Sequence, residues 1–156
     1  MKLLSFKSAL LVCIFVFIAF TSFSQVDIYR TKADARKDIA GALVNAKLKG
    51  KNVMLMFGGN WCPWCELFRE TCLGDPKLAM LLENNYERVY VGARENKDVL
   101  IEYGSPNRFG YPAFVVLNSE GKLIHIQDSA LLEEGEGYSK KKIITFFERW
   151  TVKNTK

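Results

Sequence analysis

The sequence predicts an α/β domain in which a mixed central sheet carries helices on both faces. Short continuous apolar runs, typical of strands buried on both faces, alternate with stretches whose apolar residues recur at helical spacing. The order of elements is β-α-β and then β-β-α, with one leading helix. A right-handed crossover is expected to join the first pair of strands, and a hairpin the second pair.

The N-terminal end of the chain has the features of a signal peptide. Within residues 1–24, positively charged residues lie near the start and an apolar stretch follows over 9–20. Small residues then precede a cleavage site predicted after Ser24. We therefore expect an exported protein, periplasmic or extracellular, with one domain over 25–156. The apolar stretch is shorter than the roughly 20 residues that cross a bilayer, so membrane contact is expected only if the leader is retained.

Composition excludes some classes of function. The chain has 156 residues, a formal net charge of +5, four cysteines and one histidine. This mild basic balance lacks the clustered Arg and Lys of a nucleic-acid-binding surface, so no nucleic-acid partner is expected. No Pro/Gly-rich linker divides residues 25–156, and we expect a monomer.

The first elements of the domain are a helix and a strand. Thr31 with Asp34 forms a capping pattern for a helix that runs to about Lys49, where Gly50 suits its end. The apolar run at 53–57 then predicts a strand buried on both faces.

Two helices, a strand and a short helix follow. One helix spans about 62–73, and Asp75 caps the next with Pro76 at its first position. A strand is expected over 88–92 and a short helix over 96–103.

The second half contains a hairpin and a final helix. Expected strands over 113–117 and 122–127 flank a loop in which Gly121 can take a positive φ. Ser139 caps the last helix, where apolar residues recur at three- and four-residue steps over 143–150.

The functional prediction depends on Cys62 and Cys65, at the junction of the strand over 53–57 and the helix that follows. Two thiols separated by two residues can form a disulfide when the first begins a helix, and the helix N-terminus favours its thiolate. The thiolate is the reacting species in disulfide exchange. A bridge that closes so short a loop stabilises a fold little, which favours a reactive pair over a structural one.

The run Trp-Cys-Pro-Trp-Cys at 61–65 resembles the active site of the thioredoxin superfamily. A second landmark agrees, because Tyr111-Pro112 precedes the apolar run at 113–117, where that family has a cis-proline that opens a strand beside the dithiol. The resemblance covers about residues 31–152. It is nearest to small exported bacterial thioredoxin-like proteins.

The resemblance implies a thioredoxin-like fold and a role for each matching residue. Cys62 corresponds to the attacking cysteine, Cys65 to the resolving cysteine and Pro112 to the cis-proline, while the residue before that proline offers backbone hydrogen bonds to substrate. The residues expected to shape the site and contact substrate are Trp61, Pro63, Trp64, Tyr111 and Pro112.

One position departs from the family pattern. Thioredoxins carry a buried aspartate six residues before the first cysteine, where this chain has Met56. Either another group or a water serves there, or Cys65 is activated less well. Glu66 is read as a solvated helix residue.

We predict a thiol–disulfide oxidoreductase without cofactor or metal, with the reductase direction favoured. Its partners are substrate proteins with disulfides or dithiols and a redox partner that recycles the dithiol. The alternatives are a thiol oxidase or isomerase of the same fold, a Cu(I)-handling protein, and a non-catalytic binding module. A zinc site would need Cys72 and His125 as further ligands, although Cys72 is read as a buried apolar residue.

Overall fold

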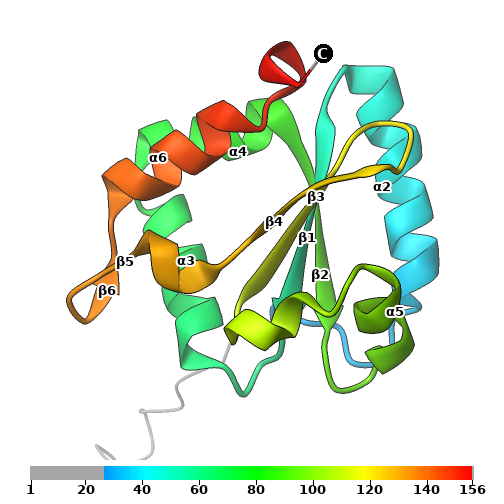
Figure 1. Ribbon diagram of the computed structural model, residues 1–156, viewed down its shortest axis with the longest axis horizontal. Coiled ribbons are helices and arrows are strands. Elements are labelled where there is room, and N and C mark those ends of the chain that lie inside the picture. The colour runs from blue at the N-terminus through cyan, green and yellow to red at the C-terminus, as the bar shows by residue number, and fades with distance from the viewer. Residues whose placement is uncertain (1–26, 156) are drawn as a thin grey trace, which may run out of the picture.

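A four-stranded sheet lies between two layers of helices in the computed structural model, which describes residues 27–155 (Figure 1). The predicted leader and its cleavage site at Ser24 lie outside the described residues. The strands are β1 (Asn52–Gly58), β2 (Tyr86–Gly92), β3 (Ala113–Leu117) and β4 (Leu123–Gln127). The helices are α2 (Ala35–Lys49), α3 (Pro63–Leu73), α4 (Pro76–Asn85), α5 (Lys97–Glu102) and α6 (Lys140–Arg149).

The sheet has the order β2-β1-β3-β4. Strand β1 pairs in parallel with β2 and antiparallel with β3, and β3 pairs antiparallel with β4. Every residue of the two central strands is buried, which explains their continuous apolar sequence. The predicted fold class, a mixed sheet built from β-α-β and β-β-α, is confirmed.

Helices cover both faces of the sheet, as predicted (Figure 1). Helices α2 and α5 pack on one face, and α3, α4 and α6 pack on the other. Successive side chains of a strand point to opposite faces, so Leu55 and Phe57 of β1 enter the first apolar layer while Met54 and Met56 enter the second.

The ends of the helices differ from the prediction in two places. The N-cap of α2 is Asp34 rather than Thr31, because the Asp34 carboxylate accepts hydrogen bonds from the N–H groups of Arg36 and Lys37, at 3.1 and 3.2 Å. Ser139 occupies the N-cap position of α6, but its side chain makes no capping hydrogen bond.

Several short elements have no counterpart in the prediction. They are the hairpin of β5 (Glu133–Glu134) and β6 (Gly137–Tyr138), and the 3-10 helices η1 (Pro106–Phe109), η2 (Ser129–Leu132) and η3 (Val152–Asn154). Two to four residues are too few to show a hydrophobic period. Across residues 27–155, no helix is long and apolar enough to cross a membrane.

The layer formed by α3, α4 and α6 centres on Phe147. Its ring is completely buried, lies 5.9 Å from the ring of Tyr86 and 6.4 Å from that of Phe68, and its carbonyl accepts a 2.7 Å hydrogen bond from the Tyr86 hydroxyl. This contact joins α6 to the strand β2 and to the helix that carries the cysteines.

Phe147→Ala should lower the free energy of unfolding by about 3–5 kcal/mol, because it removes a buried ring and leaves a cavity. Leu48→Ala is the control, since the Leu48 side chain is 80% exposed on α2 and its truncation should stay within about 0.5 kcal/mol. Chemical denaturation of the oxidised proteins gives both values. Equal midpoints for the two variants would contradict the assignment of Phe147 to the core.

Candidate active site

The buried strand β1 delivers the chain directly to the first turn of α3. After Gly58 the backbone turns, and the Cys62 N–H donates a 2.9 Å hydrogen bond to the Gly59 carbonyl. Cys62 is the N-cap of α3 and is extended, while Pro63 takes the first helical position, where a missing N–H does no harm. The strand-to-helix junction predicted from the sequence is therefore present.

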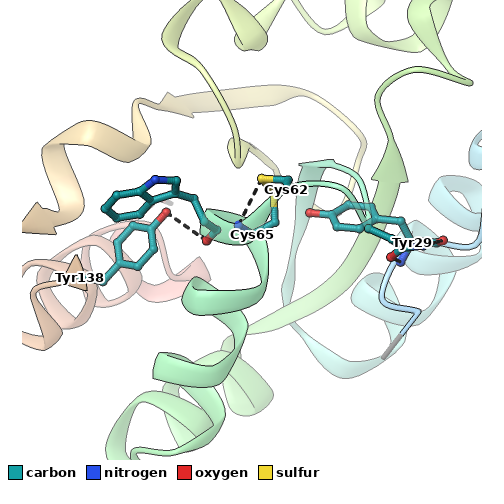
Figure 2. Close-up of a disulfide and its surroundings, with 6 residues drawn as sticks. Tyr29, Cys62, Cys65 and Tyr138 are labelled. Carbon is teal, nitrogen blue, oxygen red and sulfur yellow. Dashed lines mark hydrogen bonds between the residues drawn. A yellow bond between two sulfur atoms is a disulfide. The ribbon is translucent and has the colours of Figure 1, made fainter. Parts of the chain in front are cut away.

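A disulfide joins Cys62 and Cys65 at the start of this helix (Figure 2). The Cys62 Sγ also accepts a 3.2 Å hydrogen bond from the Cys65 N–H, in the place of an ordinary capping side chain. Cys62 is 7% exposed and Cys65 is 1% exposed, so Cys62 is the more accessible of the two. In the reduced pair, the same N–H and the positive end of the helix dipole would stabilise a Cys62 thiolate.

The Tyr111–Pro112 segment lies beside the cysteine pair. Its peptide bond is cis. Ala113 pairs with Phe57, so Pro112 stands opposite the end of β1 from which the cysteine loop leaves. Tyr111 packs against the buried cluster of Tyr29, Cys62 and Cys65.

Aromatic side chains surround the disulfide. The rings of Trp61 and Tyr111 meet edge to face at 5.3 Å, and those of Trp64 and Tyr138 do so at 5.4 Å. The Tyr138 hydroxyl also donates a 3.4 Å hydrogen bond to the Trp64 carbonyl (Figure 2). We call these four residues the aromatic rim. Trp61 is its exposed member, with 40% of its surface accessible.

Two residues, one beside the rim and one in it, were missed by the sequence analysis. The Arg94 guanidinium lies over the Trp61 ring at 4.1 Å and adds a positive charge at the exposed edge. Tyr138 comes from the β5–β6 hairpin, far along the chain from the cysteines. Neither residue belongs to a local motif, so nothing in the nearby sequence indicates its place.

Tyr29 is a third residue outside the predicted site. Its ring belongs to the same buried cluster as the cysteines and is 1% exposed. Asn60 holds its backbone, because the Tyr29 N–H donates to Asn60 Oδ1 and Asn60 Nδ2 donates to the Tyr29 carbonyl, both at 2.9 Å. Asn60 Nδ2 also donates to the Asp27 carboxylate at 2.7 Å. The cysteine loop is thus tied to the segment that precedes α2.

Cys72 and His125 do not join the cysteine pair. Cys72 lies in the apolar layer under α3, where burial raises the pKa of its thiol to about 12. His125 stacks on Trp150, with ring centroids 4.1 Å apart, and burial lowers its pKa. Within the described part of the chain, no group of three or more His, Cys, Asp and Glu residues could hold a metal ion. The four-ligand zinc arrangement considered from the sequence is not assembled.

The comparison with protein families identifies the domain. A family model described as "Thioredoxin-like domain" matches residues 39–134. The chain belongs to this thioredoxin-like family. A comparison with curated proteins finds no significant match.

Solved structures share the architecture of this thioredoxin-like domain. A disulphide isomerase from Xylella fastidiosa Temecula1 is 29% identical, with a TM-score of 0.70 over 81% of this chain and 98% of that one. The C-terminal domain of Neisseria meningitidis DsbD, in its oxidised form, is 24% identical, with a TM-score of 0.55 over 75% and 96% of the two chains. A thioredoxin from Thermus thermophilus is 22% identical, with a TM-score of 0.56 over 74% and 85%. Because their sequence identities are low, the last two similarities show only that the fold is shared.

Gly58 is required by the space around the disulfide of this thioredoxin-like domain. A Cβ at this position would lie 2.5 Å from Cys65 Sγ and 2.5 Å from the Tyr29 hydroxyl oxygen, closer than real contacts allow. Only a residue without a side chain lets β1 pass so near the sulfur.

Gly58→Ala should therefore displace the disulfide or the Tyr29 ring and lower the free energy of unfolding by about 1–3 kcal/mol, as overpacking does. Disulfide exchange with glutathione should slow as well. Gly41→Ala is the matched control in α2, where a Cβ meets nothing within 4 Å and should stabilise the helix by about 0.5–1 kcal/mol. Identical behaviour of the two variants would show that the close approach at Gly58 has no consequence.

Proposed function

We propose that this protein is a thiol–disulfide oxidoreductase that acts outside the cytoplasm on protein or small-molecule disulfides. The observation that carries the proposal is the Cys62–Cys65 disulfide, which caps α3 beside Tyr111 in a thioredoxin-like domain. A disulfide between residues so close in sequence contributes little to stability, so reactivity is the better reason for its presence.

The reductive reaction begins from the dithiol. The Cys62 thiolate attacks one sulfur of a substrate disulfide, forms a mixed disulfide and releases the other substrate sulfur as a thiolate. The Cys65 thiolate then attacks Cys62 Sγ, which restores the Cys62–Cys65 disulfide and releases the second substrate thiol. Two electrons pass to the substrate in each cycle, so a separate dithiol donor must reduce the protein before the next cycle.

The geometry supports this division of roles between the two cysteines. Cys62 is the more accessible and its sulfur receives the Cys65 N–H at the helix start, which suits the nucleophile. Cys65 is buried beneath it, which suits a resolving thiol that meets only the mixed disulfide. The aromatic rim and the Tyr111–Pro112 segment offer apolar contacts and backbone groups to an extended substrate.

The reductase direction is favoured by the simplicity of the fold. Between β2 and β3, residues 93–112 contain only α5 and the 3-10 helix η1, rather than the inserted helical domain that oxidising enzymes of this fold often carry. Residues 1–24 have the pattern of a signal peptide, which supports export into a compartment where disulfides persist.

Isomerase activity is the second candidate, because the Xylella relative at 29% identity is described as a disulphide isomerase. Isomerisation needs only a thiolate that attacks a wrong disulfide and is later displaced by another substrate thiol. A single cysteine at position 62 would suffice for it, whereas net reduction needs both.

The equilibrium potential of the Cys62–Cys65 pair should lie near that of thioredoxin, about −270 mV, if the protein is a reductase. Equilibration with a graded series of glutathione redox buffers, followed by alkylation and mass measurement, gives the value. A potential near −120 mV would instead assign the protein as an oxidant.

Cys65→Ser should trap substrates on Cys62, because the mixed disulfide then has no resolving thiol. Purification from the native compartment should yield adducts that dithiothreitol releases, while the control Cys62→Ser should trap few. Equal trapping by both variants would contradict the assignment of Cys62 as the attacking cysteine and Cys65 as the resolving one. Refolding of a scrambled disulfide protein by Cys65→Ser at the wild-type rate would favour the isomerase.

A further inference from the structure

One buried side-chain polar atom in residues 27–155 has no hydrogen-bond partner, and it is the hydroxyl oxygen of Tyr29. Tyr29 is 1% exposed, so its hydroxyl group does not reach bulk solvent. Buried hydroxyl groups are nearly always hydrogen-bonded, since leaving one unpaired is costly. An unpaired hydroxyl inside a redox site suggests a partner that forms in another state of the protein.

The hydroxyl points at the cysteine pair. Figure 2 shows the Tyr29 side chain reaching toward Cys62 and Cys65 from the side opposite Tyr138. A Cβ built on Gly58 would lie 2.5 Å from both the Tyr29 hydroxyl oxygen and Cys65 Sγ, so these two atoms are separated by at most twice that distance. A small shift of the Cys65 sulfur when the disulfide opens would bring it within reach of the hydroxyl.

Neighbouring groups hold the Tyr29 ring in this place. The two hydrogen bonds between Asn60 and the Tyr29 backbone set its position, and the Tyr90 ring meets it edge to face at 5.8 Å. Because these contacts hold the ring in place, side-chain mobility does not account for the unpaired hydroxyl group.

The chemistry of the two redox states differs at the sulfur. A disulfide sulfur is a weak hydrogen-bond acceptor, whereas a thiolate is a charged and much stronger one. Burial raises the pKa of Tyr29 and nearby Tyr90 and Tyr138 act in the same direction, so the hydroxyl keeps its proton and serves as a donor. No Asp or Glu of residues 27–155 is buried, so the described core offers no carboxylic acid to a buried sulfur.

We propose that Tyr29 donates a hydrogen bond to the Cys65 sulfur once the disulfide has opened, and thereby stabilises the reduced pair. The proposal rests on the proposed function and names the residue that supports its resolving cysteine. When an incoming thiolate attacks Cys62 Sγ, a new S–S bond forms and the Cys62–Cys65 bond breaks. The electron pair of that bond goes to Cys65 Sγ, and the Tyr29 O–H turns to it without transferring its proton.

Tyr29→Phe removes the hydroxyl and keeps the ring, so it tests the hydrogen bond directly. The equilibrium constant with glutathione should shift toward the disulfide by up to about tenfold, as expected for loss of one hydrogen bond to the reduced sulfur. For this two-electron couple, a tenfold shift is about 30 mV toward a more negative potential. Tyr90→Phe is the matched control, because it removes the hydroxyl of the adjacent ring and should leave the potential unchanged.

The stability of the two redox states gives a second readout. In the oxidised protein the hydroxyl is unpaired, so Tyr29→Phe should leave the thermal midpoint unchanged or raise it, while in the reduced protein the midpoint should fall. Equal changes in both states would mean that Tyr29 only fills space, and an equal potential shift in Tyr90→Phe would mean a general packing effect. Either result overturns the proposal.

The wild-type protein provides a test that does not depend on a variant. The hydroxyl proton of Tyr29 should exchange with solvent more slowly in the reduced than in the oxidised protein when followed by NMR, and equal exchange would overturn the proposal. These outcomes are separable from the proposed function. A wild-type dithiol that fails to equilibrate with glutathione removes that function, whereas normal equilibration without a Tyr29→Phe shift removes only the hydrogen bond.

Discussion

The position of the disulfide depends on the pairing of β1 with a strand on each side. Seven residues of β1 are matched to β2 and five to β3, and all of them are buried. A strand held in this way cannot slip by one residue without turning its apolar side chains to the wrong layer. The register therefore fixes the point at which the chain leaves the sheet, after Gly58. Cys62 follows shortly afterwards and forms the N-cap of α3. The same register brings Tyr111 and Pro112 to the neighbouring corner.

The two faces of the sheet are covered by apolar layers that contain few polar side chains. Apart from tyrosines and cysteines, the buried polar residues of the described core are Asn52, Ser129, Ser139 and Thr151, and none of these four is ionisable. The cysteine pair lies beyond the carboxyl end of β1, at the N-terminus of α3. Open α/β sheets commonly bind their ligands at that edge. The aromatic rim continues the core outward at this edge and keeps the sulfur partly shielded from water.

Much of the fold and part of the site could be predicted from the sequence because the signals are local. Continuous apolar runs indicated β1 and β3, Asp75-Pro76 indicated the start of α4, and the spacing of Cys62 and Cys65 indicated their disulfide. Tyr29, Arg94 and Tyr138 could not be found in this way, since each reaches the site through a contact across the fold. The helix start was misplaced at Thr31 because threonine and aspartate are both good caps, and only the backbone decides between them.

The burial of Cys72 makes the redox behaviour of the folded domain simple. Residues 27–155 contain three cysteines, and an odd thiol commonly allows wrong pairings or links between two molecules. Here the third thiol is 1% exposed and burial raises its pKa to about 12, which disfavours its attack on the disulfide and its reaction with peroxide. In the folded domain the described cysteines therefore form one disulfide, Cys62–Cys65, and leave Cys72 as a buried thiol. Unfolding would expose the third sulfur and permit disulfide scrambling, so native packing also preserves the Cys62–Cys65 pairing.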